Sequence, residues 1–318
     1  MYSVAISPLC AAFVLLWSSG WIASKVSLDH LGAFSFLSWR YLIVIVLLAL
    51  LVIALRSWQS LDAKQWRLHI SVGFLSHAVY LSTSLVAMQM GVSAGMVAFV
   101  TALQPLLTAT VSRHITGETV TSIQWLGVAL GVSAVGLVVA DKIVLGGSAL
   151  AYALLVASVC SLSFATLLDR RQVLARRAQQ KPPIPLSFVL LIHCVTAYLV
   201  FTMMGLVVEG LEIPATREAV YSLFYMAVVV SIGSFGLMFY LLRRMSATRV
   251  SGLTFLTPPT TMLIAWFMFQ EQLSTMDFFG LTLAAMAVFL ATRRSLSEPA
   301  AYLNKDRPRP VKLDIELA

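Results

Sequence analysis

The chain has 318 residues, of which 59% are hydrophobic and only 11% are charged. Soluble domains have roughly a quarter of their residues charged, so this composition excludes an ordinary soluble protein and indicates a protein built for lipid. The net charge of +8 comes without a basic groove interleaved with aromatic residues, and no nucleic-acid partner is expected.

Ten apolar runs of about 20 residues follow one another, which is the length that a helix needs to cross a bilayer. Because open strands would leave backbone groups unpaired in hydrocarbon, we expect an all-α integral membrane protein with ten transmembrane helices. The first run has no basic segment ahead of it and is expected to be a retained span rather than a cleaved signal peptide. The runs lie near residues 6–24, 33–55, 68–88, 93–112, 121–140, 147–168, 186–208, 219–242, 249–269 and 275–292.

Basic residues are distributed unequally between the two sides of the predicted membrane. With the N-terminus inside, the outer loops hold only Lys25, Lys142 and Arg217, and Arg40 lies within the second span. All the other Lys and Arg residues fall in inner loops or in the tail. This bias predicts cytoplasmic N- and C-termini, with basic side chains against acidic lipid headgroups.

The second half of the sequence repeats the first at an offset of 153 residues. Five spans per half is an odd number, so the second copy must enter the membrane from the opposite side and the repeats are inverted. The predicted divisions are a first repeat at 1–141, a second repeat at 142–294 with a basic cytoplasmic connector at 169–185, and a cytoplasmic tail at 295–318. The matched pairs are Thr101/Thr254, Gln104/Thr257, Pro105/Pro258, Thr108/Thr261, Glu118/Glu271 and Gly127/Gly280.

Polar residues at helical spacing mark candidate faces for binding a solute. In the fourth span Thr101 and Gln104 share a face with Pro105, and the ninth span repeats this pattern. Such faces either line a cavity, with the prolines kinking the helices and gating, or serve helix packing. The other cavity candidates are Thr254, Thr257 and Pro258 in the ninth span, His77, Tyr80 and Ser84 in the third, Ser231, Ser234 and Phe235 in the eighth, and Trp17 and Ser18 in the first.

Arg40 is the one permanent charge well inside a predicted span, roughly 12 Å from its outer end. It would either hold a substrate carboxylate or, as the favoured interpretation, act as a structural charge that reaches outer-loop carbonyls and headgroups. At the repeat offset it faces His193. Glu118 and Glu271 are also expected to be structural, stabilising the N-terminus of the next helix.

No carboxylate falls in the middle of a span, which favours facilitated diffusion or exchange over a carboxylate proton relay. His77 and His193 are the titratable groups left for any proton coupling. The three cysteines lie in apolar runs and predict neither disulfides nor a metal site, so no cofactor or metal is expected.

Several stretches resemble the EamA-type members of the drug/metabolite transporter superfamily. They are Leu16–Trp21 continuing to Lys25, Trp39–Tyr41, Pro105–Glu118 and its copy Pro258–Glu271. The resemblance implies two inverted five-helix halves, alternating access, and export of small metabolites such as amino acids across the bacterial inner membrane.

The sequence has no HExxH or GxxxxGK motif, so an enzyme is not expected. We expect an alternating-access secondary transporter of the inner (plasma) membrane that exports an amino acid or a similar amphipathic solute. Alternatives are an exporter of drug-like amphipathic cations and a channel without alternating access. The expected partners are the small-molecule solute and membrane lipid, and the chain is expected to be a monomer or weak homodimer.

Overall fold

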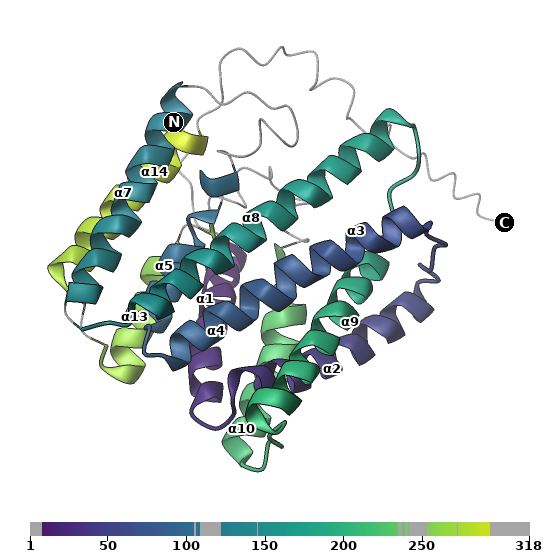
Figure 1. The fold of residues 1–318 in the computed structure, drawn as a ribbon, viewed down its shortest axis with the longest axis horizontal. Coiled ribbons are helices and arrows are strands. Elements are labelled where there is room, and N and C mark those ends of the chain that lie inside the picture. Colours follow the sequence, from purple (N-terminus) through teal and green to yellow (C-terminus); the bar gives the residue numbers. More distant parts are fainter. Residues whose placement is uncertain are drawn as a thin grey trace.

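The computed structural model describes residues 8–104, 106–108, 122–144, 146–234, 237–238, 241, 253–254, 256–271 and 273–292. All regular structure in these ranges is helical (Figure 1). The first half contains α1 (Pro8–Leu28), α2 (Ala33–Ala54), α3 (Ala63–Gly73), the π-helix η1 (Phe74–Val79), α4 (Tyr80–Gln89), α5 (Ala94–Thr101) and α7 (Ser122–Val144). The second contains α8 (Ala149–Ala178), α9 (Leu186–Met204), the π-helix η2 (Gly205–Glu209), α10 (Arg217–Phe224), the π-helix η3 (Tyr225–Ser234), α13 (Thr257–Phe269) and α14 (Thr275–Thr292).

Six helices within the described ranges are long and apolar enough to cross a membrane. Two shorter apolar helices, Ala94–Thr108 and Thr275–Ala287, accompany them. The chain is therefore an all-helical multi-pass membrane protein, while the count of ten spans stays a prediction. The six are Pro8–Leu28, Ala33–Ala54, Ala63–Gln89, Trp125–Val144, Ala149–Arg176 and Leu186–Glu209.

Some helices differ from the apolar runs that predict them. α5 ends at Thr101, and a turn at Ala102 and Leu103 interrupts the predicted span 93–112 before Pro105, which lies outside the described residues. α8 continues past the predicted end at 168 to Ala178, so the first part of the basic connector is helical. The third and eighth spans each contain a π-helical segment, η1 and η3.

Helices of the first half pack against their counterparts in the second half. α7 packs along α14, α2 along α9, and α5 along α13. The remaining contacts cross between the halves in a matching way, because α4 of the third span packs on α8 of the sixth and α1 of the first packs on η3 of the eighth. In Figure 1, α7 and α14 lie on one side and α2 and α9 on the other. The interface between the halves is thus the centre of the protein.

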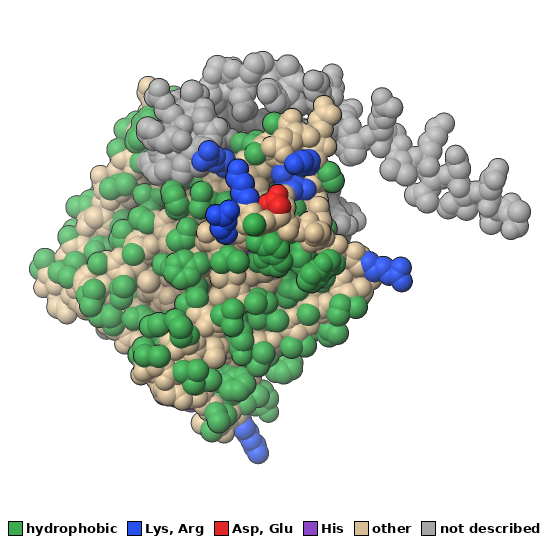
Figure 2. Space-filling model, turned by 45° about the vertical axis from the view of Figure 1, so that its right-hand side comes forward, with side chains coloured by type: hydrophobic (Ala, Val, Ile, Leu, Met, Phe, Trp, Pro, Cys, Tyr) green, Lys and Arg blue, Asp and Glu red, His purple; other side chains and the backbone are tan. Residues whose placement is uncertain are grey.

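The buried apolar residues form two main clusters joined through α1. One cluster contains Phe99, Val138 and Met262, and the other contains Phe36 and Phe201, while partly buried Trp21 and Leu28 touch both. Outside these clusters large apolar side chains are exposed, such as Phe267 at 77%, as expected for a surface that meets lipid. On the face in Figure 2 hydrophobic side chains cover most of the surface, and Lys and Arg gather mainly near one end.

Candidate functional site

Two consecutive residues of α2, Arg40 and Tyr41, connect two of the three π-helical segments, η3 and η1. Arg40 Nη2 donates a hydrogen bond of 3.1 Å to Ser231 Oγ in η3. The Tyr41 hydroxyl and His77 Nδ1 in η1 share a hydrogen bond of 2.7 Å. Their side chains diverge by about 100° around the helix, so each meets a different neighbour. Because π-helical turns are frequent at functional sites, the region between η1 and η3 is the leading candidate for the site.

Aromatic and hydroxyl groups flank Arg40. Tyr80 interacts with the Arg40 charge and lies beside Thr101, whose hydroxyl donates to the Val97 carbonyl at 2.7 Å. The rings of Trp21 and Tyr80 meet edge to face, with centroids 6.3 Å apart. Arg40, His77 and Tyr80 are each partly buried, with part of the residue left accessible. We call Arg40, His77, Tyr80, Thr101 and Ser231 the central cluster.

His193 of α9 occupies the counterpart position to Arg40 and mirrors its contacts. Its ring lies 5.8 Å from that of His77 in η1 and 5.6 Å from that of His69. Arg40 of the first half thus meets η3 of the second, and His193 of the second half meets η1 of the first. The two halves therefore exchange side-chain contacts at equivalent places, a hydrogen bond for Arg40 and a ring contact for His193.

Arg40 contacts η3 rather than outer-loop carbonyls in the described part of the chain, and both interpretations of its role, structural charge and substrate contact, stay predictions. Its guanidinium contacts Ser231 inside the bundle, and its Nε is buried without a hydrogen-bond partner among the described residues. Ion pairs in the described part of the chain join Lys25 to Glu271 and Lys142 to Asp277, and none includes Arg40. Its charge is therefore uncompensated by any carboxylate that the structure describes.

Gln104 forms its hydrogen bonds to another helix with α8, and none with Arg40. Its Nε2 donates to Thr108 Oγ1 at 3.0 Å and to Thr166 Oγ1 at 3.3 Å. Ser163 Oγ in turn donates to the Gln104 carbonyl at 3.3 Å. These contacts connect the fourth span to the sixth, and the partly accessible Gln104 amide forms a second polar group apart from the central cluster.

Several other candidates are buried at helix contacts, and the choice between packing and cavity lining stays a prediction for them. Ser18 Oγ donates to the Thr257 carbonyl at 3.4 Å, and Thr261 Oγ1 donates to the Ser18 carbonyl at 3.3 Å, which joins α1 to α13. The hydroxyls of Ser84 and Ser234 are buried without a partner in the described ranges.

The remaining candidates include one correction. Pro258 lies in the first turn of α13 and begins this helix, whereas the sequence predicted a kink within a longer one. Trp17 packs on Phe13, with ring centroids 5.5 Å apart. Thr254 is partly accessible. Pro105, Glu118, Phe235 and the predicted tail 295–318 lie outside the described residues.

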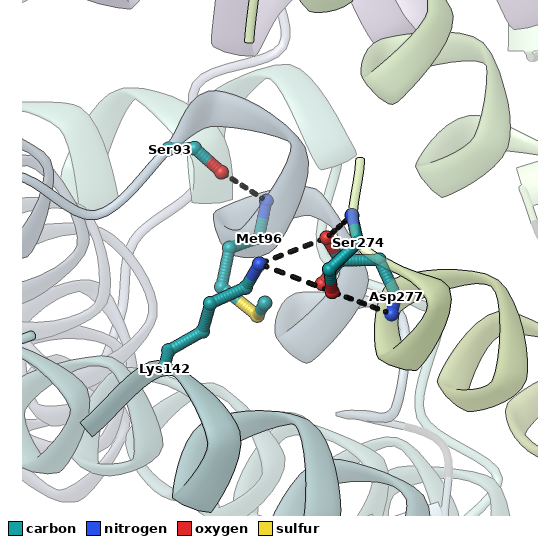
Figure 3. Close-up of polar contacts among 5 residues, drawn as sticks. All are labelled: Ser93, Met96, Lys142, Ser274 and Asp277. Atoms are coloured by element: carbon teal, nitrogen blue, oxygen red, sulfur yellow. Dashed lines mark hydrogen bonds and ion pairs between the residues drawn. The ribbon is translucent and has the colours of Figure 1, made fainter. Parts of the chain in front are cut away.

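Two ion pairs lie at the predicted outer end. Lys25 at the end of α1 pairs with Glu271. Lys142 at the end of α7 reaches Asp277 Oδ2 at 2.9 Å and Ser274 Oγ at 3.5 Å (Figure 3). Asp277 also accepts a 2.8 Å hydrogen bond from the Ser274 backbone N–H, so it is the acidic residue in the first turn of α14, a role predicted for Glu271.

A cavity of about 210 Å³ lies beside these ion pairs. Its lining residues come from both halves. They include Glu271 and Asp277, but of the two lysines they include only Lys142. The lining residues are Gly91, Ser93, Met96, Lys142, Tyr152, Met262, Glu271, Leu273 and Asp277.

Glu209 makes a further contact between the halves at this end. Its carboxylate accepts hydrogen bonds from the backbone N–H groups of Phe34 at 3.0 Å and Ser35 at 2.7 Å, at the start of α2. A carboxylate there is stabilised by the free N–H groups and the positive end of the helix dipole. Gly32 is required for this approach, because a side chain at that position would overlap the Glu209 carboxylate.

Sequence reasoning missed Tyr41, Glu209 and both ion pairs. One signal was available, because Lys25 and Lys142 are two of only three basic residues on a side that otherwise excludes them. A lysine on this side is expected to have a specific acidic partner, and both lysines have one.

In the described part, no group of three His, Cys, Asp or Glu side chains is placed to bind a metal ion.

Comparisons with known proteins agree with this architecture. A crystal structure described only as that of a protein is similar over 92% of this chain and 97% of its own, with a TM-score of 0.60 and 16% sequence identity, which concerns the fold alone. No curated protein matches the chain. The sequence model of the EamA-like transporter family matches twice, over residues 6–140 and 149–293. With both halves matched, the chain belongs to the EamA-like transporter family, whose members are membrane transporters of the drug/metabolite transporter superfamily.

Proposed function

We propose that this protein is an alternating-access secondary transporter that exports a small amphipathic metabolite, such as an amino acid, across the inner membrane. The observation that carries the proposal is the central cluster, to which both halves of the chain contribute. Arg40, Tyr80 and Thr101 come from the first half, and Ser231 comes from the second. A site shared between two halves changes shape when the halves move relative to each other, as alternating access requires.

The exchanged packing of the halves supports the same proposal. Helices pair with their repeat counterparts, and Arg40 and His193 each meet the π-helical segment of the opposite half. With five spans in each half, the two copies have opposite orientations in the membrane. Two similar halves that exchange conformations then supply an inward-open and an outward-open state.

The side chains around Arg40 favour an amphipathic solute. Trp21 and Tyr80 offer aromatic surfaces, and Ser231 and Thr101 offer hydroxyl groups. Aromatic walls with a few oriented polar groups are typical of sites for small organic molecules.

The contacts at the predicted outer end act as a gate in this proposal. The ion pairs Lys25–Glu271 and Lys142–Asp277 connect helices of the first half to segments of the second half, as does the contact of Glu209 with α2. Opening the site toward that side requires these contacts to break.

The proposal is tested by counterflow in liposomes with the purified full-length chain. A panel of labelled amino acids and amphipathic cations identifies the exchanged solutes, and the variants Tyr80→Ala and Gln104→Ala are then compared with wild type. We expect both variants to lose exchange while they still insert, whereas Phe267→Ala, at a 77% exposed position, keeps it. Normal exchange in Tyr80→Ala would refute the central cluster as the solute site, and normal exchange in Gln104→Ala would remove the second polar group from the solute path. Single-channel conductance would instead indicate a channel.

A further inference from the structure

We propose that Arg40 binds an anionic group of the solute, so that this transporter selects substrates that carry a carboxylate. The inference deepens the proposed function, because it assigns a chemical class to the solute bound at the central cluster. It starts from an imbalance of charge: Arg40 is the one cation that the structure places in the middle of a helix bundle without a described acidic partner.

The guanidinium of Arg40 stays protonated even in a low-dielectric environment, because its pKa is far above neutral pH. It carries five N–H donors, and within the described residues the hydrogen bond to Ser231 is the one polar contact that they make. The buried Nε has none. An ionised residue within a membrane segment needs a partner of opposite charge, and a carboxylate with two acceptor oxygens fits the forked guanidinium.

The neighbours of Arg40 do not supply that negative charge. The titratable groups that interact with it are Tyr41, Tyr80, His77 and Cys194, and tyrosine, histidine and cysteine side chains carry no substantial negative charge near neutral pH. None of these groups is a carboxylate.

Three acids at contacts between the helices already have partners of their own. Glu209 binds the N-terminus of α2, Glu271 pairs with Lys25, and Asp277 pairs with Lys142. A rearrangement that moved Glu271 or Asp277 to Arg40 would leave its lysine unpaired. An anionic solute would supply the missing negative charge without breaking these ion pairs.

The surroundings of Arg40 also describe the rest of this solute. The Tyr80 ring, which meets the ring of Trp21 edge to face, offers an aromatic surface near the guanidinium, and Ser231 adds a hydroxyl that already contacts Arg40. An organic acid with an apolar or aromatic substituent would place its carboxylate on Arg40 and its substituent on this aromatic surface.

The experiment measures binding to the purified full-length chain by titration calorimetry, with ligands that differ only in charge. The pairs are L-phenylalanine with L-phenylalaninamide and 3-phenylpropionate with 3-phenylpropanamide. We expect each acid to bind about 10- to 100-fold more tightly than its amide, the range for a charge-assisted hydrogen bond. Arg40→Gln should abolish this preference and Arg40→Lys should keep part of it, while Arg217→Gln, which removes a basic residue outside the central cluster, should leave it intact.

Equal binding of acid and amide to the wild type overturns the proposal, and so does failure of both acids to bind. A preference that survives Arg40→Gln also overturns it, because the selectivity would then come from another cation. Should Arg40→Gln not remain monodisperse, Ser231→Ala provides the variant, with an expected loss of about 2- to 10-fold for the acids.

Counterflow separates this proposal from the proposed function. If exchange depends on Tyr80 but shows no preference for acids over amides or amphipathic cations, the proposed transport function is supported and only the anion site is refuted. Binding of acids through Arg40 without any exchange would support the anion site and refute transport by alternating access.

Discussion

An alanine at Gly73 should force α3 away from α9, because the two helices touch there through their backbones. A Cβ atom at Gly73 would lie 2.7 Å from His193 Cα and 3.1 Å from its carbonyl oxygen. Ordinary contacts need about 3.5–4.0 Å, so the helices must separate by roughly 1 Å. Such overpacking costs about 1–3 kcal/mol, against a gain of up to about 1 kcal/mol in helix propensity.

We therefore expect Gly73→Ala to lower stability by about 1–2 kcal/mol, measured as a lower Tm in detergent. The control is Gly136→Ala in α7, where no atom lies within 4 Å of the added Cβ and stability should be unchanged or raised. A Tm for Gly73→Ala equal to that of Gly136→Ala would refute the close approach of the two helices.

A rescue experiment distinguishes a backbone clash from a side-chain clash. At Gly95 the added Cβ would lie 2.6 Å from the flexible Met262 Cγ, so Met262→Ala should recover at least half of the stability lost in Gly95→Ala. At Gly73 the obstacle is the His193 backbone, and His193→Ala should recover none. Equal rescue at the two sites would show that α3 and α9 are not in backbone contact.

Three further predictions concern charge. Lys142→Met should cost about 2–4 kcal/mol and more than Asp277→Asn in thermal unfolding, because it leaves the 4% exposed Asp277 side chain ionised without its cation; an equal cost would show that the ion pair is freely hydrated. Glu209→Gln should cost about 0.5–2 kcal/mol by weakening the contact with the N-terminus of α2, an effect that Asp29→Asn, at an exposed position just after the end of α1, should lack. Counterflow should persist with equal pH on both sides, since no described carboxylate lies near Arg40, and exchange that needs an imposed gradient would contradict this.

Helix positions could be read from the sequence because a bilayer imposes a length and an apolar composition on each span. The run predicted at 275–292 coincides with α14, and the run predicted at 33–55 differs from α2 by one residue. Local departures from a regular α-helix could not be predicted from the apolar runs. The π-helical turns of η1 and η3 and the interruption after Thr101 change the hydrogen-bonding register of the backbone without changing its hydropathy.

Partners across the bundle were harder to predict than helices. Arg40 and Ser231 are 191 residues apart, and helical spacing shows which residues share a face but not which face lies opposite. Small polar residues are also ambiguous, since Ser and Thr suit both a solute site and tight packing. Ser18 contacts the Thr257 backbone carbonyl between two helices, whereas Ser231 contacts the central guanidinium.

The ion pairs at the predicted outer end set the cost of opening the site toward that side. The side chains of Lys25 and Glu271 are 28% and 16% exposed, and those of Lys142 and Asp277 are 23% and 4% exposed. Together two such pairs contribute about 1–3 kcal/mol to the closed state. Removing the acids is the cleaner perturbation, because the two lysines keep access to water.

The double variant Glu271→Gln with Asp277→Asn should therefore raise the ratio of open to closed molecules by about 5- to 150-fold. The reporter is a cysteine at Met262, which is 3% exposed and lines the cavity beside both pairs, in a background where the three native cysteines are replaced by alanine. Its labelling by a membrane-impermeant maleimide should accelerate by the same factor if labelling follows opening. Each single variant should give part of the increase, since each pair closes the same end independently. Unchanged labelling in the double variant would mean that these ion pairs stabilise the fold without holding this end closed.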